Sequence, residues 1–289
     1  MTQTILRAPT AGFCMGVDLA LKRLETIVAD TEDTSTISTL GPIIHNPQVL
    51  NRYARKGVRQ INSLDQVVEP GRIVIRAHGI PRDMQQALEQ KEVTLIDATC
   101  PRVKKAQLLI AGQAAKGRRL LLFGEPEHPE VIGLLSYADA RSLVFESLEE
   151  LMSLALDPSI PSFLAAQTTQ DREEFVTIHQ YLMEVFPEDI PVFDTICDAT
   201  RERQREAMDI AAKVELMVVV GGYNSGNTRR LVQVARSIGT PCIHVEHAGE
   251  LDPTSFGGVG SVGITAGAST PRDLIDAVQD RIEHFFHQG

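Results

Sequence analysis

Short apolar runs alternate with amphipathic stretches along the whole chain, and this pattern limits the folds that the sequence can adopt. The runs at residues 73–75, 120–123 and 216–220 are rich in Val, Ile and Leu, as buried parallel strands are. In the stretches between such runs, for example residues 17–28, apolar side chains recur every three or four positions, which indicates helices. Repeated strand–loop–helix units predict parallel sheets with right-handed crossovers. We therefore expect an α/β fold.

The same plan repeats in each third of the chain. Boundaries near residues 97 and 193 give each third about three strand–helix units. We expect three similar lobes with mostly parallel sheets, at residues 14–96, 97–193 and 194–289. The N-terminal strand, within residues 1–13, is expected to pack with the third lobe.

Each third also contributes one cysteine, Cys14, Cys100 or Cys197, placed after a strand-like run and before a helical stretch. Amide donors and the positive end of a helix dipole favour the thiolate, which is the form that binds metal. Three converging thiolates suit a zinc ion, or three irons of a 4Fe-4S cluster whose fourth iron stays open to substrate. The alternative, that each is a small core hydrophobe, stays open. Cys242 lies inside an apolar run and is predicted to be a core thiol.

Composition excludes several classes of function. The net charge of −10 and the absence of Trp disfavour general nucleic-acid binding. No apolar stretch is long enough to span a membrane, and no signal segment is recognisable. We expect a cytoplasmic protein, in which free thiols are the ordinary state.

Polar side chains that suit an oxyanion collect in the loops after the strands. Imidazoles and small hydroxyl or amide groups at helix starts donate hydrogen bonds to phosphate oxygens. For the hydroxyl and amide residues, ordinary N-capping explains the pattern equally well. The loop residues concerned are His45, His78, His128, Thr168, Ser225, Asn227 and Ser269.

Glu130 follows His128 in the sequence His-Pro-Glu. A carboxyl group beside an imidazole can relay protons if burial raises its pKa enough to keep a proton available. A surface acid at a helix start is the competing interpretation.

A series of short motifs occurs along essentially the whole chain, at residues 12–17, 45–47, 77–79, 97–101, 128–131, 167–169, 196–200, 224–227 and 265–269. With these motifs the sequence resembles the LytB-type family of 4-hydroxy-3-methylbut-2-enyl diphosphate reductases. The resemblance implies three lobes arranged with pseudo-threefold symmetry around a central 4Fe-4S cluster. It implies cluster ligands Cys14, Cys100 and Cys197, with one iron left open.

The resemblance also assigns roles to the loop residues. It implies that Glu130, His128 and Thr168 serve the substrate hydroxyl and proton delivery. Many members carry a second serine where this chain has Gly226, whose backbone amide can still donate a hydrogen bond. The implied diphosphate ligands are His45, His78, Ser225, Gly226, Asn227 and Ser269.

The implied reaction is reductive dehydroxylation to isopentenyl and dimethylallyl diphosphate, the last step of the methylerythritol phosphate route to isoprenoids. Reduced ferredoxin or flavodoxin is the expected electron donor. Two other interpretations stay open. One is a redox-neutral 4Fe-4S hydro-lyase acting on another phosphorylated alcohol, and the other is a non-enzymatic metal or redox sensor.

Overall fold

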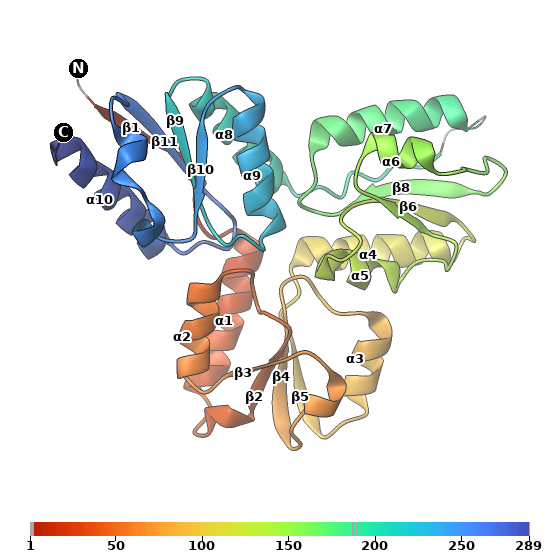
Figure 1. Ribbon diagram of the computed structural model, residues 1–289. Coiled ribbons are helices and arrows are strands. Elements are labelled where there is room, and N and C mark those ends of the chain that lie inside the picture. Colours follow the sequence, from red (N-terminus) through yellow and green to blue (C-terminus); the bar gives the residue numbers. More distant parts are fainter. Residues whose placement is uncertain (1–2, 187, 189, 289) are drawn as a thin grey trace. The chain divides into compact units, whose positions relative to one another are not determined.

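The computed structural model describes residues 3–186, 188 and 190–288. In this part of the chain the strands form three parallel sheets with helices packed against them (Figure 1), which confirms the predicted α/β class. The chain divides into two compact units. Unit 1 comprises Met1–Asp18, Ile44–Asn51 and Asp198–Gly289, and unit 2 comprises Leu19–Ile43 and Arg52–Cys197. No helix of the described residues has both the length and the apolar character needed to cross a membrane.

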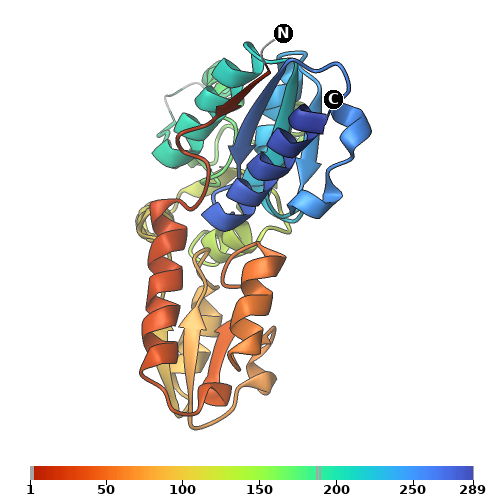
Figure 2. The same ribbon diagram turned by 90° about the vertical axis from the view of Figure 1, so that its left-hand side faces the viewer.

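Unit 1 contains one sheet, in which β9 (Leu216–Val220) is buried on both faces. Val218 and Val220 pack in the same apolar cluster as Ile275 and Val278 of α10, and Val219 packs with Leu231 of α9. Because alternate side chains of a strand point to opposite faces, a continuous apolar run is needed here. Figure 2 shows α10 lying along one face of this sheet.

The remaining elements of unit 1 complete this sheet and its helical layers. The N-terminal strand pairs in parallel with the last strand of the chain, Thr4 opposite Ser261. In sheet order the strands are β1 (Thr4–Arg7), β11 (Ser261–Ala266), β9 and β10 (Cys242–Val245). The helices are α8 (Asp198–Ala211), α9 (Gly226–Ser237) and α10 (Arg272–Gln288), with short 3-10 turns η3 (Ala248–Glu250) and η4 (Pro253–Phe256).

The first sheet of unit 2 has the order β3 (Arg59–Ile61), β2 (Ile37–Leu40), β4 (Gly71–Ile75) and β5 (Val93–Asp97). Its core includes Leu40, Ile73 and Ile75, and α3 (Arg82–Glu89) covers it with Leu88. Two helices, α1 (Met15–Ala29) and α2 (Pro47–Arg55), begin in unit 1 and end in unit 2. The 3-10 turns η1 (Thr34–Thr36) and η2 (Leu64–Gln66) complete this part.

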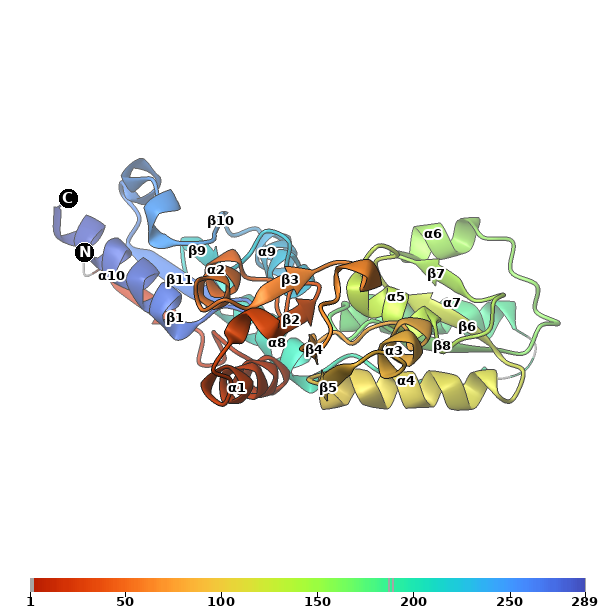
Figure 3. The same ribbon diagram turned by 90° about the horizontal axis from the view of Figure 1, so that it is seen from below.

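The second sheet of unit 2 is organised around β6 (Arg119–Phe123), which lies between β7 (Leu143–Phe145) and β8 (Ser162–Ala166). Leu120 and Leu122 pack against α4 (Pro101–Ala114) and α5 (Pro129–Leu135). Leu121 and Phe123 face α6 (Leu148–Ser153) and α7 (Arg172–Val185). Figures 1 and 3 show α4 running along the length of this sheet. The alternation again explains the unbroken apolar sequence of the central strand.

The strand-like run expected before Cys197 corresponds to residues 192–193, and in the structure it forms only a single bridge between Val192 and Leu164. Pro191 has no N–H to extend the ladder backwards. Beyond the bridge, the Thr195 hydroxyl accepts a hydrogen bond from the Ala166 amide at 2.8 Å, so a side chain takes the place of the next backbone partner. The prediction of a strand there was therefore wrong.

Candidate functional site

Each of the three predicted ligand cysteines lies directly before a helix, as the sequence indicated. Cys14 precedes α1, Cys100 precedes α4 with Pro101 at its first position, and Cys197 precedes α8. None of the three is in a disulfide, and all three are of intermediate exposure. Partly accessible cysteines at helix starts suit an iron–sulfur cluster, because metal can reach their sulfur atoms.

The backbone amide of each cysteine is bonded to a loop that carries another predicted site residue. Cys14 donates its N–H to the carbonyl of Ala268, which precedes Ser269, at 3.2 Å. Cys100 donates to Ala77, which precedes His78, and Cys197 donates to Thr168, both at 2.9 Å. The fold therefore ties the cysteine loops to the loops expected to hold substrate, within each compact unit.

Cys242 differs from these three. It lies in β10 and packs against two small apolar clusters of unit 1. Burial raises the pKa of its thiol to about 11, so it stays protonated at neutral pH. The packing agrees with the prediction of a core thiol, although the residue as a whole is only partly buried.

In unit 1, three loops meet around His45. The Ser269 hydroxyl donates to the His45 carbonyl oxygen at 3.1 Å. A Cβ added to Gly222 would lie 2.7 Å from the same oxygen, so only glycine allows the two backbones to approach this closely. The loops concerned, residues 44–47, 221–228 and 267–270, contain no charged side chain.

The start of α9 supplies further hydrogen-bond donors. Ser225 caps this helix by accepting the Thr228 amide at 3.3 Å, which confirms the capping interpretation for its side chain. Because the oxygen acts as the acceptor, the hydroxyl proton can still be donated to a ligand. Gly226 is the first helical residue. Asn227 is 5% exposed, and its Nδ2 is buried without a hydrogen-bond partner among the described residues.

In unit 2, Glu130 lies in the first turn of α5 and is 1% exposed. Its Oε1 accepts the Thr168 amide at 2.7 Å, and its Oε2 accepts the Thr168 hydroxyl at 2.8 Å. Burial raises the pKa of this carboxyl group to about 7, although the two hydrogen bonds from Thr168 oppose the shift. Glu130 is thus no surface acid. It is a buried group that can hold or release a proton at neutral pH.

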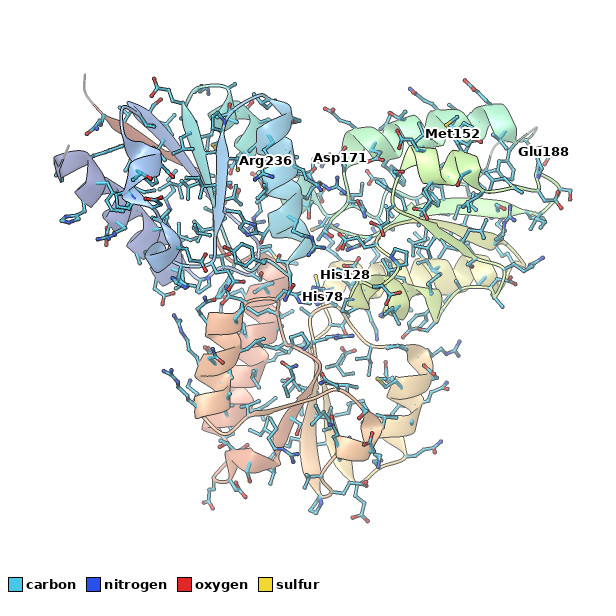
Figure 4. The ribbon with its side chains drawn as sticks, viewed as in Figure 1. His78, His128, Met152, Asp171, Glu188 and Arg236 are labelled. Carbon is cyan, nitrogen blue, oxygen red and sulfur yellow. The ribbon has the colours of Figure 1, made fainter. Side chains whose placement is uncertain are left out.

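His128 is the N-cap of α5, and its Nδ1 accepts the Glu130 amide at 3.1 Å. A nitrogen that accepts a hydrogen bond carries no proton, so this bond selects the neutral tautomer with its proton on Nε2. The rings of His128 and His78 are 5.3 Å apart in an edge-to-face arrangement, and they lie side by side in Figure 4. Two imidazoles and one acid therefore occur together in unit 2.

The threonines after β8 do not cap the helix that follows. Asp171 caps α7 by accepting the Glu174 amide, and the Thr168 hydroxyl is committed to Glu130. The structure adds Gln167, which is fully buried. Its Oε1 accepts the Glu125 amide at 2.9 Å and its Nε2 donates to the Thr169 hydroxyl at 3.0 Å. A polar residue directly after a buried strand was the available signal for this loop-fixing role.

The predicted site residues thus fall into two groups, one in each unit. Unit 1 holds Cys14, His45, Ser225, Gly226, Asn227 and Ser269. Unit 2 holds Cys100, Cys197, His78, His128, Glu130 and Thr168.

Known proteins resemble this chain along nearly its full length. The family model described as LytB protein matches residues 5–283. A 4-hydroxy-3-methylbut-2-enyl diphosphate reductase of Solidesulfovibrio magneticus is 55% identical over 97% of this chain and 99% of its own. One of Nitratidesulfovibrio vulgaris is 53% identical over 96% of this chain and 99% of its own.

Solved structures of reductases with these names also resemble this chain. That of the E-1-hydroxy-2-methyl-but-2-enyl-4-diphosphate reductase from Plasmodium falciparum has a TM-score of 0.92 and 26% identity, covering 97% of this chain and 88% of that one. A structure of (E)-4-hydroxy-3-methyl-but-2-enyl diphosphate reductase has a TM-score of 0.69 and 38% identity, covering 98% of this chain and all of that one. The chain belongs to the LytB protein family.

Proposed function

We propose that this chain is an iron–sulfur reductase that converts 4-hydroxy-3-methylbut-2-enyl diphosphate to isopentenyl and dimethylallyl diphosphate, the last step of the methylerythritol phosphate route. The observation that carries the proposal is the buried Glu130, held by Thr168 with its pKa near 7. A buried acid that carries a proton at neutral pH is what removal of a hydroxyl group as water requires. The names of the relatives support the substrate.

The cofactor we assign is a 4Fe-4S cluster bound by Cys14, Cys100 and Cys197, with one iron open to substrate. The donor set fits, since these are the three cysteines that precede helices, whereas Cys242 lies in β10, where burial keeps its thiol protonated. When bound, such a cluster supplies single electrons and Lewis acidity.

The diphosphate is bound in this proposal by neutral donors. Ser225 supplies a hydroxyl group, and the Ser269 hydroxyl can donate once it rotates away from the His45 carbonyl oxygen. Gly226 supplies a backbone amide, and Asn227 supplies a buried amide nitrogen that has no hydrogen-bond partner among the described residues. His45 and His78 add imidazoles. A helix start favours an anion because its first amides have no intrahelical partner.

The protein's own groups then manage the protons. Removal of the hydroxyl consumes two electrons and two protons, one of which leaves in water and one of which joins carbon. Glu130 delivers a proton from its buried carboxyl group, and the Thr168 hydroxyl orients it. His128 donates a hydrogen bond from Nε2, since its Nδ1 is held as an acceptor. The second proton is taken up from solvent. Protonation of the allylic unit at either end gives the two products.

The electrons come from a small carrier of the ferredoxin or flavodoxin type, and we place the reaction in the cytoplasm. The decisive experiment is anaerobic reconstitution with iron and sulfide, followed by assay of the allylic diphosphate with and without a chemical reductant. We expect turnover only with the reductant. Turnover without any electron source would contradict the reductase and favour a redox-neutral hydro-lyase. Failure to bind iron and sulfide would contradict the cofactor.

A further inference from the structure

Arg203, in the second turn of α8, is a buried cation beside the cysteine loops. It is 4% exposed, its Nη2 donates to the Gly12 carbonyl oxygen at 2.8 Å, and its Nη1 donates to the Ala199 carbonyl oxygen at 3.2 Å. Gly12 lies two residues before Cys14, and Ala199 lies two residues after Cys197. One guanidinium group therefore bonds to the backbone that flanks two of the proposed cluster ligands.

Arg203 and Cys14 also line the same cavity in unit 1, which has a volume of about 590 Å³. The guanidinium stays charged at any pH the protein meets, and the carboxylate side chains Asp18 and Glu202 line the same cavity. A negatively charged thiolate–iron site at this cavity would be a further anionic neighbour of Arg203. The Gly12 backbone has φ +117°, a conformation suited to glycine, and the bond from Arg203 helps to hold it.

The other buried arginine among the described residues has a different environment. Arg119, also 4% exposed, donates to the Ser162 hydroxyl at 3.1 Å and to the Asp157 carbonyl at 3.3 Å. These contacts join the first residues of β6 and β8 to the preceding loop, and no proposed site residue is among them. Arg119 therefore provides a matched control for the loss of a buried arginine.

We propose that Arg203 is a positioning residue for the iron–sulfur site, which holds the Cys14 loop through Gly12 and raises the reduction potential of the cluster with its positive charge. The inference rests on the cluster assigned above. Reduction adds one negative charge to the cluster, so a nearby cation stabilises the reduced form. Net charge and hydrogen bonding are among the means by which proteins set such potentials.

The test compares Arg203→Gln, Arg203→Lys and Arg119→Gln after anaerobic reconstitution. The midpoint potential of the cluster is measured by redox titration monitored by electron paramagnetic resonance, and hydrogen exchange is measured at the amides of Phe13 and Cys14. Arg203→Gln should lower the potential, so that the ratio of reduced to oxidised cluster at a fixed poise falls on the order of tenfold, or 59 mV for one electron. Arg203→Lys should keep the potential near that of the wild type but speed the exchange of both amides. Arg119→Gln should change neither.

Equal potentials in the wild type and Arg203→Gln would overturn the electrostatic role. If Arg203→Gln does not hold a cluster, Arg203→Lys decides, and unchanged exchange at Phe13 and Cys14 would overturn the positioning role. A wild-type protein that binds no cluster would refute the proposed cofactor instead. Hydrogen exchange in the metal-free protein would then still test the bond from Arg203 to Gly12.

Discussion

Replacing Glu130 with Gln removes an acid while keeping its contacts. The amide oxygen of glutamine can accept the Thr168 N–H, as Oε1 of Glu130 does. The amide nitrogen can donate to the Thr168 hydroxyl, which rotates to act as the acceptor in place of donating to Oε2. The variant should therefore fold with the same local geometry, and any loss of activity reports on the proton.

The effect on stability follows from the pKa of Glu130, which rises from 4.5 to about 7 on folding. A raised pKa means that folding favours the protonated form. The contribution of this group to the free energy of unfolding is therefore fully present below pH 4.5 and is lost as pH rises through about 7. The difference corresponds to about 3 kcal/mol of unfolding free energy above pH 7. Glutamine does not ionise and loses no stability as pH rises. The stability of the variant relative to the wild type should therefore increase by about this amount between pH 4.5 and pH 8.

Activity should change in the opposite direction. A positioned general acid contributes about 100-fold or more to a rate, so turnover of Glu130→Gln should fall at least that far. Wild-type turnover should itself fall as pH rises through about 7. Anaerobic steady-state assays measure the first effect, and urea unfolding of the metal-free protein across pH 4.5–8 measures the second. Glu127→Gln, at an exposed position in the loop directly before α5, is the control. Wild-type turnover in the Glu130 variant, or parallel stability profiles, would refute the reasoning.

Three further substitutions separate structural from chemical roles. Thr168→Val removes a buried hydrogen bond that lowers the pKa of Glu130, so the free energy of unfolding should fall by about 1 kcal/mol and the alkaline fall in kcat should move to higher pH. An unchanged pH profile of kcat would contradict the coupling between Thr168 and Glu130. His128→Asn keeps an N-cap for α5 but loses the imidazole, so the free energy of unfolding in urea should change by no more than about 0.5 kcal/mol while kcat falls about 100-fold. Full activity of this variant would mean that His128 serves only as a helix cap. Ser225→Asp also preserves the cap of α9 but adds a negative charge, so KM for the diphosphate should rise at least about tenfold. A wild-type KM would remove Ser225 from the binding site.

The fold was largely predictable because its signals are local. The apolar sequences of β6 and β9 follow directly from burial on both faces, and helical spacing marked most helices. The shortest elements, such as β3, β7 and α6, carry too few residues to show a period. The bridge at Val192 was mistaken for a strand because the competing bond from Thr195 comes from a side chain.

The site was predictable in its residue types and not in its bonding. The sequence predicts the position of each cysteine before a helix. It does not predict the partner of the Thr168 hydroxyl, because Glu130 lies 38 residues away and only the packing of α5 against the β8 loop brings the two residues together. The pKa of Glu130 depends on burial, which the sequence motif His-Pro-Glu does not encode.

The three uncharged loops around His45 have a consequence for ionic strength. The chain carries a net charge of −10, so its long-range field repels a diphosphate before any contact is made. Salt at 0.15 M screens such a field beyond about 8 Å, yet it leaves short hydrogen bonds from hydroxyl and amide groups nearly untouched. Added salt should thus raise the association rate of the substrate without raising its dissociation rate. A pocket built from lysine and arginine would show the reverse dependence.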